Sequence, residues 1–592
     1  MYKGIAVSPG VVVGVAFRID SGLGPSEPQV ISDRALIPAE VAQFESALEQ
    51  SASELKVFVQ KVAQEVGDSK AEIFQSHIQL VNDPELRDRV RHLIESRGLT
   101  VTSALHLVLQ EYVGRFAGLE QEFFRERLAD IRDVILRIVG HLSIDGSPFL
   151  AAMAGRDLNE ANGEPVILVA HEILPSQAMS LGDFAIAGIV TETGGGTSHA
   201  AILARSRGIP AVSGVASITS EVASGDPIIV DGRDGVVLVR PDSETTAAYR
   251  KMQREFFDLK DRLVLNRDQP AISSDGTRIE LLANINNVAD AHAAGKVGST
   301  GVGLYRTEFL FLSHQDVPDE EEQYQYYKKV LESSPNQSTT IRTLDLGGDK
   351  TVPYLGRRYE ANPFMGWRSI RLSFEHPRLF EQQIRAILRA GRHGKVSMLF
   401  PMITTLEELR YVNKLVEETK RNLRKEGVEF GEDVKTGVMV EVPAAAVCID
   451  AILRETDFIS IGSNDLIQYL VAADRDNPKV AHLCEPLSPA ILRVLSMVLD
   501  ACKRTGTQVT LCGEMAGQPR SVLVLFGMGL RRFSMSPAFV PTIKALLSRV
   551  TTAQAERFAH HVLQLKTSEE IRAYLTARLH EISSDLEVFD FS

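Results

Sequence analysis

The second half of the chain constrains the fold most, because short apolar runs alternate there with helical stretches from about residue 270 onward. The runs lie at 281–286, 301–304, 341–344, 397–401, 437–440, 458–462 and 509–511. Repeated strand–helix units over roughly 300 residues favour a (β/α)8 barrel.

Polar side chains stand in these runs or just after them. In a barrel the active site forms at the carboxyl ends of the strands, because the strand-to-helix loops converge there. Arginine forks match carboxylate and phosphate groups, and two carboxylates from different strands suit Mg²⁺. A single Arg or Glu is mostly solvated and a Cys is often inert core, but the shared location favours a common site. The residues are Arg306, Arg342, Lys350, Arg368, Glu441, Asn464, Asp465, Arg475 and Cys512.

The first half of the chain mixes two patterns. Residues 5–17 are typical of a strand pair broken by Ser8-Pro9-Gly10, and 228–239 is typical of a hairpin. Between them, apolar residues at three-to-four spacing predict amphipathic helices and a helical bundle over about 34–146. Strand signals return at 166–169 and 186–190, which predicts a bundle inserted into a small α/β domain. A charged helix with one apolar stripe follows, and its position suggests a connector.

The segment Gly194-Gly195-Gly196-Thr197-Ser198-His199 opens an alanine-rich helix in that α/β domain. Glycines let the backbone approach a bulky anion, and Thr197 or Ser198 can cap the helix. His199 then falls in the first helical turn, where the dipole favours negative charge and disfavours imidazolium. The chain has 14 histidines, and most histidines are surface or satisfied polar groups. The agreement of glycines, caps and helix start makes His199 a candidate phosphoryl acceptor.

Composition excludes several classes. The net charge of -13 argues against nucleic-acid binding and suits a basic protein partner. The four cysteines form no Cys-x-x-Cys pair, so neither a zinc ribbon nor a disulfide framework is expected. No signal peptide and no bilayer-spanning run are visible, which predicts a soluble protein of a reducing compartment.

Several motifs together resemble the Enzyme I family of the bacterial sugar phosphotransferase system, the phosphoenolpyruvate–protein phosphotransferases. Domain order and length match over essentially the whole chain. The motifs are Ser8-Pro9-Gly10, the His199 loop, the stretches 303–310, 342–350 and 362–368, the Asn464-Asp465 loop and Cys512-Gly513-Glu514.

The resemblance implies a multidomain α/β fold and a function. His199 would take the phosphoryl group of phosphoenolpyruvate and pass it to a histidine of the carrier protein HPr. Cys512 would protonate the enolate carbon as pyruvate forms, and Glu441 and Asp465 would bind Mg²⁺. The positions that match phosphoenolpyruvate-binding residues are Arg306, Arg342, Lys350, Arg368, Asn464 and Arg475.

The resemblance also implies domains and partners. Residues 1–33 and 147–240 would form a swivelling phosphohistidine domain, with the HPr-docking bundle inserted at 34–146. A connector helix at 241–268 would lead to the phosphoenolpyruvate-binding barrel at 269–592, through which a cytoplasmic homodimer would form.

Two other functions stay open on the sequence. A dikinase or synthase that uses ATP would need a nucleotide-grasp domain, whereas the first 150 residues are mostly helical bundle without a glycine-rich phosphate loop. An inactive or regulatory homologue could bind HPr through the helical insert, although the site residues are retained. Leu174 and Gly196 also stand where relatives often have Thr and Arg, and we expect altered rates from these changes.

Overall fold

The computed structural model describes most of the chain. The described residues are 1–8, 10–19, 29–31, 33–66, 80–116, 131–132, 134–139, 141–142, 164–173, 186–193, 204, 208–312, 317–347, 360, 362–475, 477 and 479–586. They divide into two compact units, 1–253 and 254–592, which are described separately.

The first unit contains one mixed sheet of eight strands in the order β1-β8-β7-β3-β4-β5-β6-β2. The strands are β1 (Tyr2–Lys3), β2 (Ile5–Ser8), β3 (Val11–Ile19), β4 (Val166–Ala170), β5 (Ile186–Thr191), β6 (Ala211–Ser213), β7 (Pro227–Asp231) and β8 (Val236–Val239). The predicted hairpin is confirmed, because β7 and β8 pair antiparallel. The short helix α9 (Ile218–Glu221) follows β6.

The predicted strand pair at the N-terminus is wrong in one respect. Both strands exist, but β2 pairs with β6 at the sheet edge, while β3 lies between β7 and β4. β2 and β3 therefore lie apart in the sheet and do not form a hairpin. The strands that pair with β2 and β3 lie far along the chain, so the residues near position 10 carry no local signal for this pairing.

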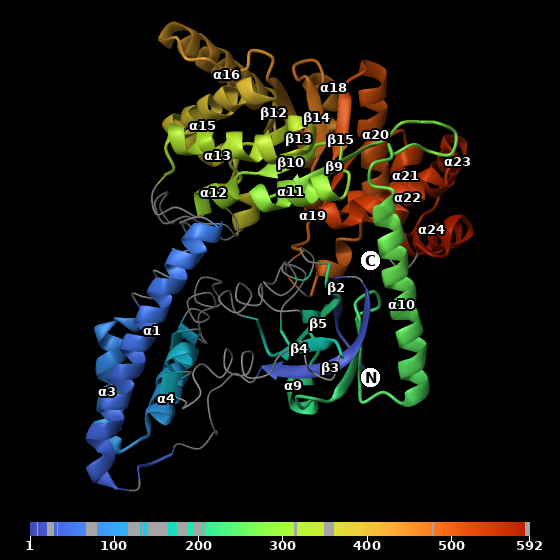
Figure 1. Cartoon of the computed structure of the whole chain (residues 1–592). Coiled ribbons are helices and arrows are strands. Elements are labelled where there is room, and N and C mark those ends of the chain that lie inside the picture. The colour runs from blue at the N-terminus through green and yellow to red at the C-terminus, as the bar shows by residue number, and fades with distance from the viewer. Residues whose placement is uncertain are drawn as a thin grey trace. The chain divides into compact units, whose positions relative to one another are not determined.

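A helical subdomain lies between β3 and β4 in the sequence and has its own core. Its helices are α1 (Ile37–Val66), which a 3-10 turn at Arg34–Leu36 precedes, α3 (Pro84–Arg97) and α4 (Val101–Phe116). Asp83 caps α3 and Gly98 ends it in the left-handed conformation, as is typical of helix ends. Buried Phe44, Leu93, Leu105 and Ile135 pack in one apolar cluster, as the three-to-four spacing predicted. Figure 1 shows α1, α3 and α4 running side by side.

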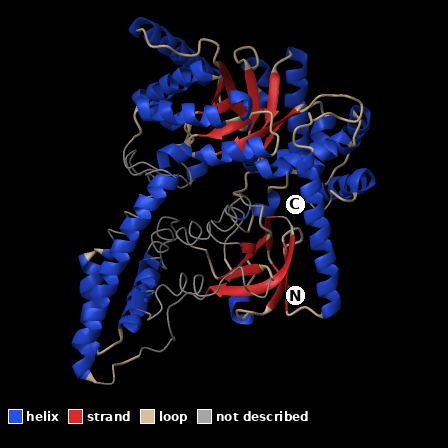
Figure 2. Ribbon diagram, in the orientation of Figure 1, coloured by secondary structure: helices blue, strands red, loops and turns tan. Residues whose placement is uncertain are grey.

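The second unit is a closed barrel of eight parallel strands, which confirms the predicted (β/α)8 fold. The strands are β9 (Glu280–Ile285), β10 (Val302–Arg306), β11 (Ser338–Arg342), β12 (Lys395–Phe400), β13 (Lys435–Val440), β14 (Phe458–Ile461), β15 (Gln508–Leu511) and β16 (Arg532–Met535). Figure 2 shows these strands in red with helices around them. The sequence located seven of these strands and missed β16, where only Phe533 and Met535 are apolar.

Helices cover the outside of the barrel. They are α11 (Val288–Lys296), α12 (Glu308–Leu312), α13 (Glu320–Ser333), α14 (Ile370–Glu375), α15 (Pro377–Ala390), α16 (Leu406–Glu426), α17 (Pro443–Val447), α18 (Ile449–Ile452), α19 (Ser463–Val471), α20 (Pro489–Thr505), α21 (Pro519–Gly527), α22 (Val540–Ser548), α23 (Thr552–Val562) and α24 (Ser568–Ser583). Capping boxes start α13, α16, α23 and α24. Helix α10 (Ser243–Leu265) occupies the stretch between the hairpin and the barrel. None of the described helices is both long and apolar enough to cross a membrane.

Candidate active site

One end of the barrel gathers eight of the polar residues that the sequence singled out. Arg306 and Arg342 are the last residues of β10 and β11, and Glu441 and Cys512 directly follow β13 and β15. The remaining four lie in loops or in the first turn of a helix behind these strands: Arg368, Asn464, Asp465 and Arg475. Parallel strands bring all these positions to the carboxyl end of the barrel. Lys350 and His199 lie outside the described residues.

Arg342 is a buried cation held between two carboxylates. Its Nη2 lies 3.0 Å from Glu308 Oε1, and its Nη1 lies 3.1 Å from Asp345 Oδ2. Burial alone would lower the pKa of Arg342, but the carboxylates of Glu308 and Asp345 raise it above its ordinary value. The guanidinium is therefore charged and fixed in place.

Arg368 shares one of these carboxylates. Its Nη2 donates to both oxygens of Asp345 at 3.0 Å, and its Nη1 donates to the Tyr469 hydroxyl at 3.2 Å. Burial lowers the pKa of Arg368, while Asp345 and Asp465 raise it to a net value above the ordinary one. Tyr469 in turn donates to the Phe364 carbonyl at 2.6 Å, which ties the loop around 364 to helix α19.

Glu441 and Asp465 bring two carboxylates close together in a buried place. Burial first, and then the carboxylates of Asp465 and Asp345, raise the pKa of Glu441 to about 8. Glu441 Oε1 accepts from the Met402 backbone N–H at 2.7 Å. Asp465 Oδ1 is buried and has no hydrogen-bond partner within the described part of the chain, although Arg475 Nη1 lies 3.5 Å away.

These features fit a divalent cation. Repulsion between the two carboxylates disappears when a cation lies between them, and Mg²⁺ characteristically takes one or two carboxylates plus substrate oxygens and water. The described residues contain no cluster of three or more His, Cys, Asp or Glu that would hold a metal without other ligands. The carboxylate pair therefore suits Mg²⁺ bound together with an oxygen-rich substrate.

Arg306 is the cation with the least compensation at this end. Burial and the neighbouring Arg342 lower its pKa. Its Nη1 donates to Asn286 Oδ1 at a long 3.4 Å, and no described carboxylate forms an ion pair with it. A half-buried cation in this state is stabilised by an anionic ligand, so Arg306 is a strong candidate for contact with phosphate.

Cys512 is a buried, protonated thiol. Burial raises its pKa to about 11, and Sγ lies 3.5 Å from the Ile461 carbonyl. Asn284 Nδ2 donates to the Cys512 carbonyl at 2.9 Å, and Ser534 Oγ donates to Asn284 Oδ1 at 2.6 Å. The loop after β15 is thus fixed from β9 and β16, and its thiol can donate a proton near pH 7.

Glycines allow two close approaches in this region. A Cβ on Gly513 would lie 1.8 Å from Ser463 Oγ, so the loops after β14 and β15 could not meet with a larger residue. Asn464 Oδ1 accepts from the Glu514 backbone N–H at 2.9 Å across the same contact. Gly347 has φ of +106°, and its Cβ would lie 2.5 Å from Arg368 Cβ. Both glycines are needed to bring the polar loops together.

The structure adds residues that the sequence reasoning did not identify. Glu308, Asp345, Tyr469 and Asn284 all contact the predicted site residues. Glu308 lies two residues after the end of β10 and Asp345 three residues after the end of β11, and that position could have marked them. Local sequence patterns do not reveal their partners. Glu308 pairs with Arg342 on the next strand, and Asp345 pairs with Arg368 in a loop 23 positions further along the chain.

In the first unit, the carboxyl ends of β4 and β5 carry a hydrogen-bonded histidine. His171 Nδ1 lies 2.6 Å from Glu192 Oε2, and Glu192 Oε1 accepts from the Thr219 backbone and hydroxyl at 2.8 and 2.6 Å. Thr193 donates to the His171 carbonyl at 3.0 Å. The described residues stop there, directly before the segment that holds His199.

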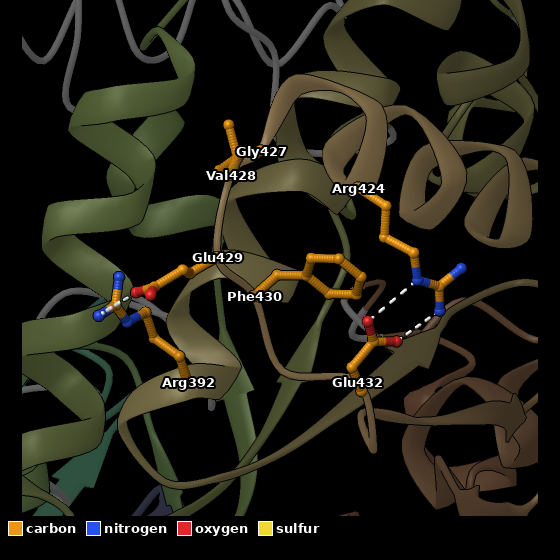
Figure 3. Close-up of a pocket in the computed structure, with 7 residues that line it drawn as sticks. All are labelled: Arg392, Arg424, Gly427, Val428, Glu429, Phe430 and Glu432. Atoms are coloured by element: carbon orange, nitrogen blue, oxygen red, sulfur yellow. Dashed lines mark hydrogen bonds and ion pairs between the residues drawn. The ribbon is translucent and has the colours of Figure 1, made fainter.

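A cavity of about 420 Å³ lies elsewhere on the second unit. Its lining comes from the end of α16 and from the segments just before β12 and β13, which places it at the amino end of the barrel. Figure 3 shows Arg392 facing Glu429 and Arg424 facing Glu432, each pair 2.5 Å apart. None of the predicted site residues lines this cavity.

Comparison with protein families defines the class of enzyme. Three family models match: PEP-utilising enzyme, N-terminal, at residues 3–127; PEP-utilising enzyme, mobile domain, at 162–235; and PEP-utilising enzyme, PEP-binding domain, at 260–552. The last covers all eight barrel strands and the loops that follow them. The chain is thus a phosphoenolpyruvate-utilising enzyme by class.

Individual relatives define the family of the chain more narrowly than the family models do. Proteins named phosphoenolpyruvate-protein phosphotransferase from Priestia megaterium and Listeria monocytogenes are each 39% identical to the chain. The alignments cover 98% and 96% of this chain and 99% and 97% of those proteins. One of the same name from Bacillus subtilis is 38% identical over 97% of this chain and 98% of its own length. The chain belongs to the phosphoenolpyruvate-protein phosphotransferase family.

Proposed function

We propose that this protein transfers the phosphoryl group of phosphoenolpyruvate to its own His199 and then to a histidine of HPr, with release of pyruvate. This would be the first step of sugar uptake by the phosphotransferase system. The near full-length similarity to proteins of that name is the observation that carries the proposal. The buried arginines at the carboxyl end of the barrel support it independently.

Phosphoenolpyruvate is a small molecule with two anionic groups, and the barrel end offers several cations. We assign its binding to Arg306, Arg342, Lys350, Arg368, Asn464 and Arg475. Phosphoryl transfer depends mainly on positioning and on neutralising the equatorial oxygens, which fixed guanidinium groups supply. Arg306, as the least compensated cation, is the best candidate for the phosphate.

Glu441 and Asp465 would hold Mg²⁺. The bound ion would neutralise charge on phosphate and enolate oxygens. Buried Glu441 would bind as the carboxylate, after loss of the proton that its raised pKa of about 8 favours in the free site.

Cys512 would act as the general acid. When the phosphorus–oxygen bond breaks, the phosphoryl group goes to a His199 nitrogen and the bond electrons stay on the enolate oxygen. The thiol then donates its proton to the methylene carbon, which yields pyruvate and a thiolate that solvent reprotonates. A pKa of about 11 keeps the acid protonated at neutral pH.

We assign the parts of the chain as follows. Residues 1–33 and 147–240 form the swivelling domain with His199, and 34–146 forms the HPr-binding domain. The segment 241–268, which contains α10, is the connector, and 269–592 binds phosphoenolpyruvate and mediates a homodimer. The same histidine must reach a small acid and a protein partner, so a mobile domain is required. We place the protein in the cytoplasm, where its four free cysteines stay reduced.

Intact mass spectrometry tests this function. The protein and its His199→Ala variant are incubated with phosphoenolpyruvate and Mg²⁺, with and without HPr. One acid-labile phosphoryl group on the wild type alone, passed on to HPr, is the expected result. Absence of label from phosphoenolpyruvate would favour the inactive or regulatory homologue that binds HPr. Label that requires ATP would favour a dikinase.

A further inference from the structure

Asp345 joins two arginines that come from different parts of the barrel. It accepts from Arg342, the last residue of β11, at 3.1 Å and from Arg368, in the loop before α14, at 3.0 Å to each oxygen. The Asp345 backbone N–H donates to Glu308 Oε1 at 3.1 Å, so the carboxylate is itself anchored. All three charged side chains are at least nine-tenths buried, with exposed fractions of 3% for Asp345, 6% for Arg342 and 5% for Arg368.

The arrangement restricts how each arginine can contact a ligand. Arg342 uses Nη1 for Asp345 and Nη2 for Glu308, while its Nε is buried with no hydrogen-bond partner in the described structure. Arg368 uses Nη2 for Asp345 and Nη1 for Tyr469. Neither guanidinium can rotate without breaking its own hydrogen bonds to the carboxylate that the two arginines share.

We propose that Asp345 is a positioning residue that holds Arg342 and Arg368 as one preformed unit for a ligand with two anionic groups. The inference rests on the proposed function, since phosphoenolpyruvate carries a phosphate and a carboxylate. It extends that function because Asp345, which acts through the two arginines, would help to recognise both anionic groups of the ligand. A ligand with one anionic group needs only one correctly placed cation and depends less on Asp345.

A misplaced charge matters in such a site because orientation is part of binding and catalysis. A shift of about 1 Å in a positioning group can cost about 100-fold in rate. Asp345→Asn keeps the size of the side chain but removes the charge and turns one acceptor into a donor that faces a guanidinium. Asp345→Glu keeps the charge and moves the carboxylate by one methylene. Both changes should disturb the pair, whereas a purely electrostatic role would tolerate the second.

Calorimetric titration in the His199→Ala background, which prevents turnover, tests the proposal. Phosphoenolpyruvate and inorganic phosphate are titrated separately with Mg²⁺ present. We expect Asp345→Asn and Asp345→Glu to weaken phosphoenolpyruvate binding by about 10-fold or more and phosphate binding by less than about 3-fold. Equal loss for both ligands, or no loss for either, would overturn the proposal.

A double-mutant cycle separates positioning from general damage. Arg368→Lys keeps a cation but loses the planar fork. If Asp345 acts through the arginines, Asp345→Asn should weaken phosphoenolpyruvate binding less in the Arg368→Lys background than in the parent, because only the contact with Arg342 remains to be lost. Fully additive losses would contradict it.

Glu280→Gln is the matched control, because it breaks a carboxylate–arginine pair with Arg532 at the other end of the same barrel. Its binding of phosphoenolpyruvate should match that of the parent. Circular dichroism and thermal melting of each variant show whether it is folded. Failure of the parent protein to bind phosphoenolpyruvate would instead reject the proposed function itself.

Discussion

The two ends of the barrel treat charged side chains differently. At the carboxyl end two buried carboxylates are incompletely balanced: burial and Asp465 raise the pKa of Glu441, and Asp465 Oδ1 has no hydrogen-bond partner among the described residues. At the amino end, Arg532 pairs with Glu280 and donates to Thr510 Oγ1 at 3.2 Å, while Glu280 keeps 43% of its side chain exposed.

The difference separates stability from function. Charges at the amino end are satisfied within the protein or by water, so they need nothing else. At the carboxyl end Arg342 and Arg368 are paired with carboxylates. Glu441 and Asp465 repel each other instead, and Asp465 Oδ1 lacks a hydrogen-bond partner among the described residues, so these two groups gain from a bound cation. Such a site lowers the stability of the empty protein and is retained for chemistry.

The largest effect expected is that of Glu441→Gln. Loss of one carboxylate of the proposed metal pair should reduce phosphorylation by phosphoenolpyruvate about 1000-fold, while thermal stability without metal is unchanged or increased. Glu441 has an ordinary pKa of 4.5 and a folded-state pKa of about 8, so the native state binds its proton more tightly than the unfolded chain. Its favourable contribution is complete below pH 4.5 and is lost as pH rises to about 8.

Differential scanning calorimetry in EDTA at pH 5.5 and pH 8 measures this effect. The wild type should lose more melting temperature between the two pH values than Glu441→Gln does. The same pH dependence in both proteins would remove the contrast between the two barrel ends. Kinetic assays with Mg²⁺ on the same preparations measure the loss of activity.

A smaller effect concerns Cys512, another ionisable group that burial keeps neutral. Its pKa of about 11 predicts slow alkylation that rises about tenfold per pH unit up to that value. At pH 8, iodoacetamide should modify exposed Cys448 at least about 100-fold faster than Cys512. Peptide mass spectrometry over a time course measures both rates, and equal rates would show that the carboxyl end does not suppress ionisation.

The smallest effect on activity is expected at the amino end. Glu280→Gln leaves partly buried Arg532 without its carboxylate and should lower the melting temperature by about 2–4 °C. Activity should stay within about twofold of wild type, because no group at the carboxyl end is touched. Steady-state kinetics and melting curves give both values.

Arg424→Ala is the surface comparison for that variant. Arg424 and Glu432 form an exposed pair beside the amino-end cavity, and such pairs contribute little to stability. We expect no measurable change in melting temperature or activity. A loss of activity in either amino-end variant would contradict the division between the two ends.

Much of the fold could be predicted because its signals are local. Seven apolar runs were long and apolar enough to identify strands, and helical spacing identified α1 and α4. Strand β16 was missed because Arg532 and Ser534 alternate with its two apolar residues. Those polar side chains are satisfied by Thr510 on β15 and Asn284 on β9, contacts that exist only in the closed barrel.

The candidate site also has features that the sequence predicts locally and features that depend on the folded structure. Barrel topology placed Arg342, Glu441 and Cys512 at one end, because residues that end parallel strands must converge there. Asp345 lies in the motif at 342–350, but its partner Arg368 lies 23 positions away and is brought close by the fold. The roles assigned to all the site residues stay predictions, and His199 and Lys350 also lie outside the described structure.

The sequence by itself determined the class of fold, the strand ends that carry charge and the family, because each depends on residue type and spacing along the chain. Tertiary structure alone decided which charges neutralise one another, as in Arg342 and Arg368 with Asp345, and which do not, as in Glu441 with Asp465. The physical reason is that burial and Coulomb interactions depend on distance in space, which the order of residues does not fix.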